Sequence, residues 1–140
     1  MKSSQTNCQF STDGFDSPPS RSKRVLVVED EWIVARDLSD LLQRLGHVPV
    51  GPAANSSDAI RLASVQKPDL ILMDIQLDGS MDGIMAAAEI AGRHAVPVIY
   101  ITANSHVFLN GDSEMVAPYI CIAKPFSEEG LLAAIESVVL

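Results

Sequence analysis

Four short apolar runs, separated by longer amphipathic stretches, constrain the fold of this 140-residue chain most strongly. The runs read VLVV, LILM, VIYI and ICIA, and they begin at Val25, Leu70, Val98 and Ile120. None of them alternates apolar and polar residues, which is typical of strands that are buried on both faces of a parallel sheet. A weaker run, HVPVG near residue 50, predicts a fifth strand closer to an edge of that sheet.

The stretches between these runs carry helix signals. Glu31–Arg44 has apolar residues at helical spacing, and Gly46 follows as the residue that ends the helix. Ser56 or Ser57 is predicted to cap a second helix, which runs to about Gln66 and is stopped by Pro68.

Three further helices complete the pattern. Asp82–Arg93 is rich in alanine, and Ser127 precedes two glutamates that suit the first turn of the last helix. The stretch 105–118 is the poorest helix, because Asn110 and Gly111 interrupt it. Strand and helix therefore alternate five times, which predicts an α/β fold: a three-layer, doubly wound (βα)5 parallel sheet with the flavodoxin-like strand order 2-1-3-4-5.

The first 24 residues differ from the rest in composition. They are rich in Ser, Asp, Pro and Gly, they show no periodicity, and we expect them to form a disordered tail before one domain over residues 25–140. Their formal charge is +2, so the remainder of a chain of net charge −8 carries about −10, which argues against nucleic-acid binding. Two cysteines, no signal peptide and no apolar run of membrane-spanning length predict a reduced, cytoplasmic setting without membrane contact.

Acidic residues stand where two of the predicted strands end. The first strand runs into Glu29 and Asp30, and the third ends at Asp74. In doubly wound sheets, ligands bind beyond the carboxyl ends of the strands where the strand order reverses, here between the first and third strands. Three carboxylates in one crevice repel one another unless a cation joins them, and oxygen ligands of this kind suit Mg²⁺.

Two more polar residues stand at the ends of the fourth and fifth strands. Thr102 follows the fourth strand and Lys124 the fifth, so a hydroxyl and an ammonium face the same edge as the carboxylates. Such a set suits a tetrahedral anion, above all a phosphoryl group. Each of these residues taken alone has an ordinary explanation as a turn former, a strand residue or a solvated charge, so the prediction depends on their joint placement.

The motifs VLVVEDE, LILMDIQLDGSMDGI, VIYITA and IAKPF resemble the receiver domain of two-component response regulators over Val25–Leu140. The resemblance implies that Asp74 accepts a phosphoryl group from a phosphohistidine. It also implies that Asp30, Asp74 and the backbone carbonyl of Gln76 hold Mg²⁺, with Glu29 acting largely through a metal-bound water. Lys124 and Thr102 would contact phosphoryl oxygens.

The partners that the resemblance implies are a sensor histidine kinase or a histidine phosphotransfer protein. We therefore expect a stand-alone signalling module that acts through protein–protein contacts and loses its own phosphoryl group slowly, and not an enzyme. The family further implies a cis bond between Lys124 and Pro125, and it places Gln76 and Asn104 beside the path of the hydrolytic water.

The chain departs from the family pattern at two places. Cys121 stands three residues before Lys124, where the family usually has an aromatic switch, and Asn110-Gly111 lies in the fourth helix. A small, largely apolar thiol cannot fill or vacate the volume of a ring. The usual transmission of the signal is therefore not expected here.

Three other functions stay open on the sequence alone. A phosphatase of the haloacid-dehalogenase type also uses an Asp nucleophile, Mg²⁺, Thr and Lys, but Gln76 stands where its acid/base Asp is usual. A flavodoxin-like cofactor binder would need a hydroxyl- or glycine-rich loop where this chain has VEDEW. A receiver-like domain used only for docking would not need the acidic residues and Lys124.

Overall fold

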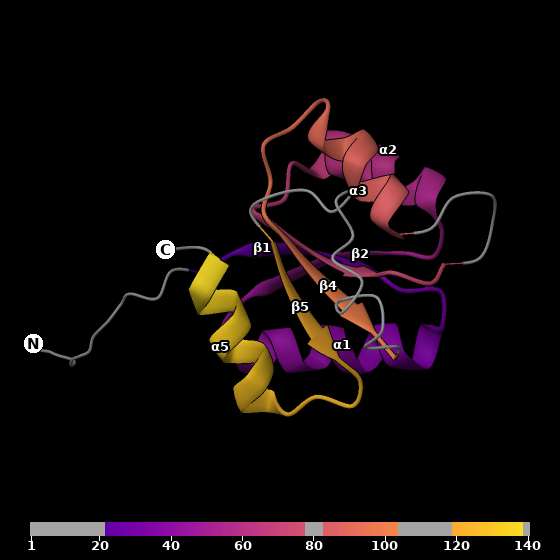
Figure 1. Ribbon diagram of the computed structural model, residues 1–140. Coiled ribbons are helices and arrows are strands. Elements are labelled where there is room, and N and C mark those ends of the chain that lie inside the picture. Colours follow the sequence, from indigo (N-terminus) through magenta and orange to yellow (C-terminus); the bar gives the residue numbers. More distant parts are fainter. Residues whose placement is uncertain (1–21, 78–82, 104–118, 139–140) are drawn as a thin grey trace, which may run out of the picture.

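The computed structural model describes residues 22–77, 83–103 and 119–138 (Figure 1). Nearly all of the predicted tail and the predicted fourth helix lie outside these residues. The described elements, in chain order, are β1 (Arg24–Val28), α1 (Trp32–Arg44), β2 (Val48–Ala53), α2 (Ser56–Gln66), β3 (Leu70–Asp74), α3 (Gly83–Ala91), β4 (Val98–Thr102), β5 (Tyr119–Ala123) and α5 (Glu128–Val138). Among the described helices, none combines the length and apolar character needed to cross a membrane.

The five strands form one parallel sheet in the order β2-β1-β3-β4-β5. This confirms the predicted flavodoxin-like order and the position of the HVPVG strand at an edge. β2 contains Pro49 and Pro52, and its pairing with β1 shifts register between Leu26 and Val28. Helices cover both faces of the sheet, α1 and α5 on one and α2 and α3 on the other (Figure 1).

Successive residues of each central strand enter opposite layers of the core. In β1, Val25 and Val27 pack with α1 and α5, whereas Leu26 and Val28 pack with α2 and α3. All five residues of β3 and of β4 are buried. The runs lack polar alternation because both faces of these strands are removed from water.

Local capping explains where the helices begin and end. Gly46 has a φ of +91°, and its N–H donates to the carbonyl of Gln43, while the N–H of His47 donates to the carbonyl of Leu42. This pair of hydrogen bonds is the Schellman motif, and it confirms Gly46 as the residue that ends α1.

The cap of α2 and the burial of His47 are two features that the sequence did not predict. The cap of α2 is Asn55, whose side chain accepts from the N–H of Asp58, so the predicted caps Ser56 and Ser57 were wrong by one or two positions. His47, directly after the turn that ends α1, is buried, and its Nδ1 accepts from the N–H of Lys23.

Candidate functional site

The register of the sheet brings the predicted site residues to one level. Val28 of β1 pairs with Met73 of β3, so Glu29 and Asp74 each follow at the next position. Asp74 in turn pairs with Ile101, directly before Thr102. The carboxyl ends of three adjacent strands thus present a carboxylate, a carboxylate and a hydroxyl side by side.

Glu29, Asp30 and Asp74 form a compact acidic cluster. Each offers a carboxylate oxygen, and these oxygens all lie within 4.8 Å of one another. Glu29 is 2% exposed and Asp74 is 6% exposed, whereas Asp30 is half-buried. Sequence reasoning grouped these three residues correctly, but it could not tell which of them would be removed from water.

Lys124 is the cation that faces this cluster. Its Nζ lies 3.4 Å from Oε2 of Glu29 and 3.5 Å from Oδ2 of Asp74. The backbone N–H of Lys124 donates to the backbone carbonyl of Thr102. This bond between the ends of β4 and β5 holds the lysine at the level of the carboxylates. The bond between Lys124 and Pro125 is cis, as predicted.

The electrostatics of the cluster are unbalanced. Burial, and then the neighbouring carboxylate of Asp74, raise the pKa of Glu29 from 4.5 to about 8. Burial acts to lower the pKa of Lys124, but the charges of Asp74 and Glu29 outweigh it and raise that pKa. Within the described residues, Oε1 of Glu29 is a buried oxygen without a hydrogen-bond partner. Lys124 lies near two of the carboxylates, yet the pKa of Glu29 stays raised, so the site is suited to a further cation.

The donor set fits Mg²⁺. It consists of carboxylate oxygens, and the unpartnered oxygen of Glu29 is available beside them. Gln76, whose carbonyl was predicted to complete the set, is tied to the site through its N–H, which donates to Oδ1 of Asp74 at 3.0 Å. That hydrogen bond also restricts the rotation of the Asp74 side chain.

The other predicted site residues are placed as follows. Thr102 is fully buried at the end of β4, and Cys121 is half-buried in β5, where burial raises the pKa of its thiol to about 11. Asn104 lies outside the described residues. Gly83 was missed: its N–H donates to the carbonyl of Ile75 at 2.7 Å and ties the start of α3 to the residue after Asp74. The signal was the glycine in MDGI, at the start of a predicted helix.

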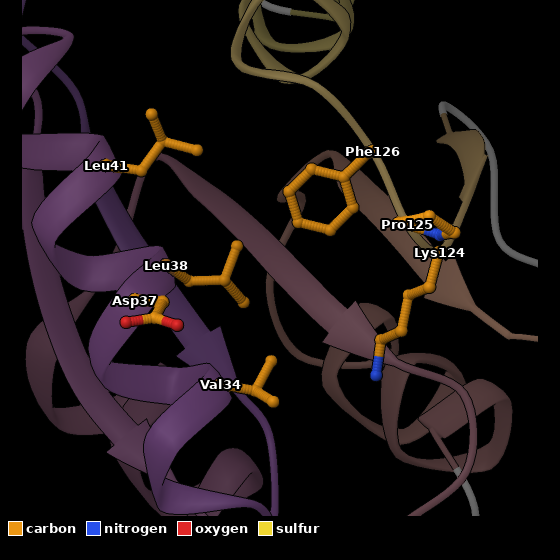
Figure 2. Close-up of a pocket in the computed structure, with 7 residues that line it drawn as sticks. All are labelled: Val34, Asp37, Leu38, Leu41, Lys124, Pro125 and Phe126. Carbon is orange, nitrogen blue, oxygen red and sulfur yellow. The ribbon is translucent and has the colours of Figure 1, made fainter.

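An apolar groove of about 320 Å³ adjoins the acidic cluster. Its lining comes from α1 and from the segment after β5, and consists of Val34, Asp37, Leu38, Leu41, Lys124, Pro125 and Phe126. Figure 2 shows the ring of Phe126 facing Leu38 and Leu41 across the groove, with the stem of Lys124 along one side. Lys124 therefore belongs to both places, with its stem in the groove and its ammonium at the carboxylates.

Comparison with known proteins gives a consistent result. Residues 25–136 match the family described as response regulator receiver domain. The transcriptional regulatory protein PdtaR of Mycobacterium tuberculosis is 36% identical over 124 residues, which are 89% of this chain and 60% of that protein. The protein PilH of Pseudomonas aeruginosa is 33% identical over 120 residues, covering 82% of this chain and 96% of PilH.

A solved structure agrees with these relatives. The receiver domain of the Erythrobacter litoralis response regulator PhyR, determined by solution NMR, superposes with a TM-score of 0.75 at 37% identity. The match covers 84% of this chain and 90% of that one. The chain spans about 60% of the length of PdtaR, so the likeness to that relative concerns this one domain.

Proposed function

The chain belongs to the response regulator receiver family, and we propose that it accepts a phosphoryl group on Asp74 from a phosphohistidine. The observation that supports this most directly is the convergence of Glu29, Asp30 and Asp74 within 4.8 Å, with Nζ of Lys124 at 3.5 Å from the Asp74 carboxylate. Phosphoryl transfer depends mainly on positioning and on neutralising the charge of the transferred oxygens. A carboxylate nucleophile held between acidic and basic groups meets both requirements.

The division of roles follows from position. Asp74 supplies the attacking oxygen: a P–O bond forms, the P–N bond of the phosphohistidine breaks, and its electron pair stays on the imidazole nitrogen. The ring leaves neutral when its other nitrogen carries a proton. In this proposal Lys124 contacts one phosphoryl oxygen, and Thr102, at the end of the adjacent strand, contacts another.

We propose that Asp30, Asp74 and the carbonyl of Gln76 hold Mg²⁺, with Glu29 contributing through its buried carboxylate. When bound, the ion would neutralise charge on the transferred phosphoryl group. The chain's own residues set the geometry, because the N–H of Gln76 orients Asp74 and the sheet fixes the spacing of the strand ends. The expectation that Glu29 acts mainly through a water stays a prediction.

The surface around the site suits a protein as phosphodonor. Trp32 is 69% exposed and Ile33 is 59% exposed, and both begin α1 directly after the acidic cluster. Together with the groove, they offer apolar area beside a charged reaction centre, as protein interfaces do. We propose a sensor histidine kinase or a histidine phosphotransfer protein in this role, and signalling by contact with a further protein.

The test uses a small phosphodonor and two matched variants. With Mg²⁺ and acetyl phosphate, the protein should gain one hydroxylamine-labile phosphoryl group, as measured by intact mass. Asp74→Asn should abolish the gain, and a chelator should suppress it in the wild type. Asp69→Asn is the control, because Asp69 precedes the same strand at its opposite end.

Undiminished labelling of the Asp74→Asn protein would contradict the assignment. Repeated turnover of small phosphoesters without a stable phosphoprotein would favour the phosphatase alternative instead. Transfer from each purified kinase of the source cell would then identify the natural phosphodonor.

A further inference from the structure

The start of α3 lies against the backbone of the phosphoacceptor with no space to spare. Gly83 is buried, and a Cβ built on it would overlap the carbonyl oxygen of Asp74. The same atom would stand 2.9 Å from the carbonyl carbon of Asp74 and 2.9 Å from Cα of Ile75. These neighbours are backbone atoms, which cannot rotate away as a flexible side chain can.

The helix has no freedom to retreat from this contact. Ile84, Ala86, Ala87 and Ile90 are all buried, and they pack in the same core cluster as Met73 and Ile75. Moving α3 outward to admit a methyl group would open a gap in a close-packed layer. A side chain at position 83 would therefore press directly on the Asp74–Ile75 backbone, so a displacement there is expected.

Two consecutive hydrogen bonds carry that displacement to the site. The N–H of Gly83 donates to the carbonyl of Ile75 at 2.7 Å, and the N–H of Gln76 donates to Oδ1 of Asp74 at 3.0 Å. The first bond holds the backbone of Ile75 against the start of α3. The second bond, from the next residue, orients the Asp74 carboxylate. The carbonyl of Gln76, a proposed ligand, belongs to the same short segment.

We propose that Gly83 is a positioning residue for the acidic cluster: lacking a side chain, it lets α3 begin in contact with Asp74 and so fixes the direction of the Asp74 carboxylate. The inference deepens the proposed function and depends on it for its purpose. Groups that orient a metal ligand typically change metal affinity by about 10–100-fold when altered. We therefore expect an effect on Mg²⁺ binding that exceeds any effect on folding.

The experiment compares Gly83→Ala with Gly92→Ala in the full chain. Gly92 follows the end of the same helix, and a Cβ there would meet only the carbonyl oxygens of Glu89 at 3.4 Å and Ala88 at 3.8 Å, which is ordinary contact. Mg²⁺ titrations followed by the amide signals of Glu29 and Asp30 give the dissociation constant, and urea denaturation gives the stability. Gly83→Ala should raise the dissociation constant at least about tenfold, and Gly92→Ala should leave it unchanged.

A Gly83→Ala protein that folds and binds Mg²⁺ as the wild type does would overturn the inference. If that variant does not fold, hydrogen exchange in the wild type decides: Mg²⁺ should slow exchange of the Gly83 amide more than that of the Gly92 amide. Equal slowing of the two would overturn the inference. Wild type that binds Mg²⁺ but takes no phosphoryl group would contradict the proposed function and leave the role of Gly83 standing.

Discussion

The two ends of the sheet treat their polar groups in opposite ways. At the amino end, the N–H of Arg24 donates to Asp69, its guanidinium donates to the carbonyl and side chain of Gln66, and Nδ1 of His47 accepts from Lys23. At the carboxyl end, Glu29 and Asp74 share the ammonium of Lys124, and among the residues that the structure describes, Oε1 of Glu29 has no hydrogen-bond partner. In the part of the chain that the structure describes, these polar groups at the amino end pair with one another, whereas the carboxyl end keeps an unpartnered oxygen that the proposed cation would compensate.

The difference indicates that the carboxyl end contributes less to the stability of the folded chain than the amino end. Like charges in one crevice lower the stability of the folded chain, and such arrangements are found mainly where a ligand compensates them. The described residues of the amino end show no such conflict, so their contacts are expected to contribute to folding and not to phosphoryl transfer. Changes at each end should separate these two properties.

The largest effect on stability is expected at Glu29. Its pKa is raised to about 8 in the folded protein, so the folded state keeps a proton that the unfolded state loses above about pH 4.5. The stabilising contribution is therefore full below pH 4.5 and is lost as pH rises toward 8. The wild type without Mg²⁺ should lose up to a few kcal/mol over this range, at about 1.36 kcal/mol per pKa unit.

Urea denaturation with and without Mg²⁺ measures this loss. Glu29→Gln should flatten the dependence on pH and reduce the stabilisation that Mg²⁺ gives at pH 8. Glu129→Gln, which changes an exposed acidic residue of α5, is the control. If the stability of the Glu29→Gln protein depended on pH as that of the wild type does, a group other than Glu29 would cause the loss of stability.

A smaller effect of opposite sign is expected at His47. Burial, and then the charge of Lys23, lower its pKa, so the unfolded state takes up a proton first as the pH falls below 6.5. The stabilising contribution is present above pH 6.5 and is lost on acidification, together with a hydrogen bond worth about 0.5–1.5 kcal/mol. His47→Asn keeps an acceptor for the N–H of Lys23 but does not titrate.

The check is again urea denaturation, now between pH 7 and pH 5, beside labelling with acetyl phosphate. His47→Asn should lose less stability than the wild type over this interval and should be labelled equally well. Impaired labelling of the variant would show that the two ends of the sheet are coupled. It would contradict the assignment of folding to one end and phosphoryl transfer to the other.

The smallest effect is expected at Cys121, between the two ends. This half-buried thiol pairs in register with Tyr100, and burial raises its pKa to about 11, so it is inert near neutral pH. Cys121→Ala should change stability by only about 0.5 kcal/mol. The amide shifts produced by a phosphoryl mimic with Mg²⁺ should be the same in both proteins, because the thiol does not distinguish the two states. Loss of those shifts in the variant would give Cys121 a part in switching.

Sequence patterns predicted the features that depend on local chemistry or on the order of elements. Continuous apolar runs predicted strands with two buried faces, and the strand order placed Asp74 beside Glu29 and Asp30. Gly46 and Ser127 were found at the expected helix ends, and the N–H of Gly130 donates to the Ser127 hydroxyl. Each of these signals acts within a few residues or follows from chain connectivity.

The features that were missed depend on packing between distant parts of the chain. Asn55, Ser56 and Ser57 are all good caps, and Asn55 is the one whose extended backbone lets its side chain accept from the N–H of Asp58. Glu29 is buried and its N–H donates to the carbonyl of Ala53 across the end of β2, whereas Asp30 is half-buried. The need for glycine at position 83 appears only once α3 lies against β3.

The two prolines of β2 have a consequence for association between molecules. An edge strand exposes unpaired N–H and carbonyl groups, onto which a strand of another chain can add. Pro49 and Pro52 have no N–H to offer, and the shift in register between Leu26 and Val28 makes this edge irregular. The β2 edge is therefore a poor template for aggregation, and partners are expected to approach over helices and loops.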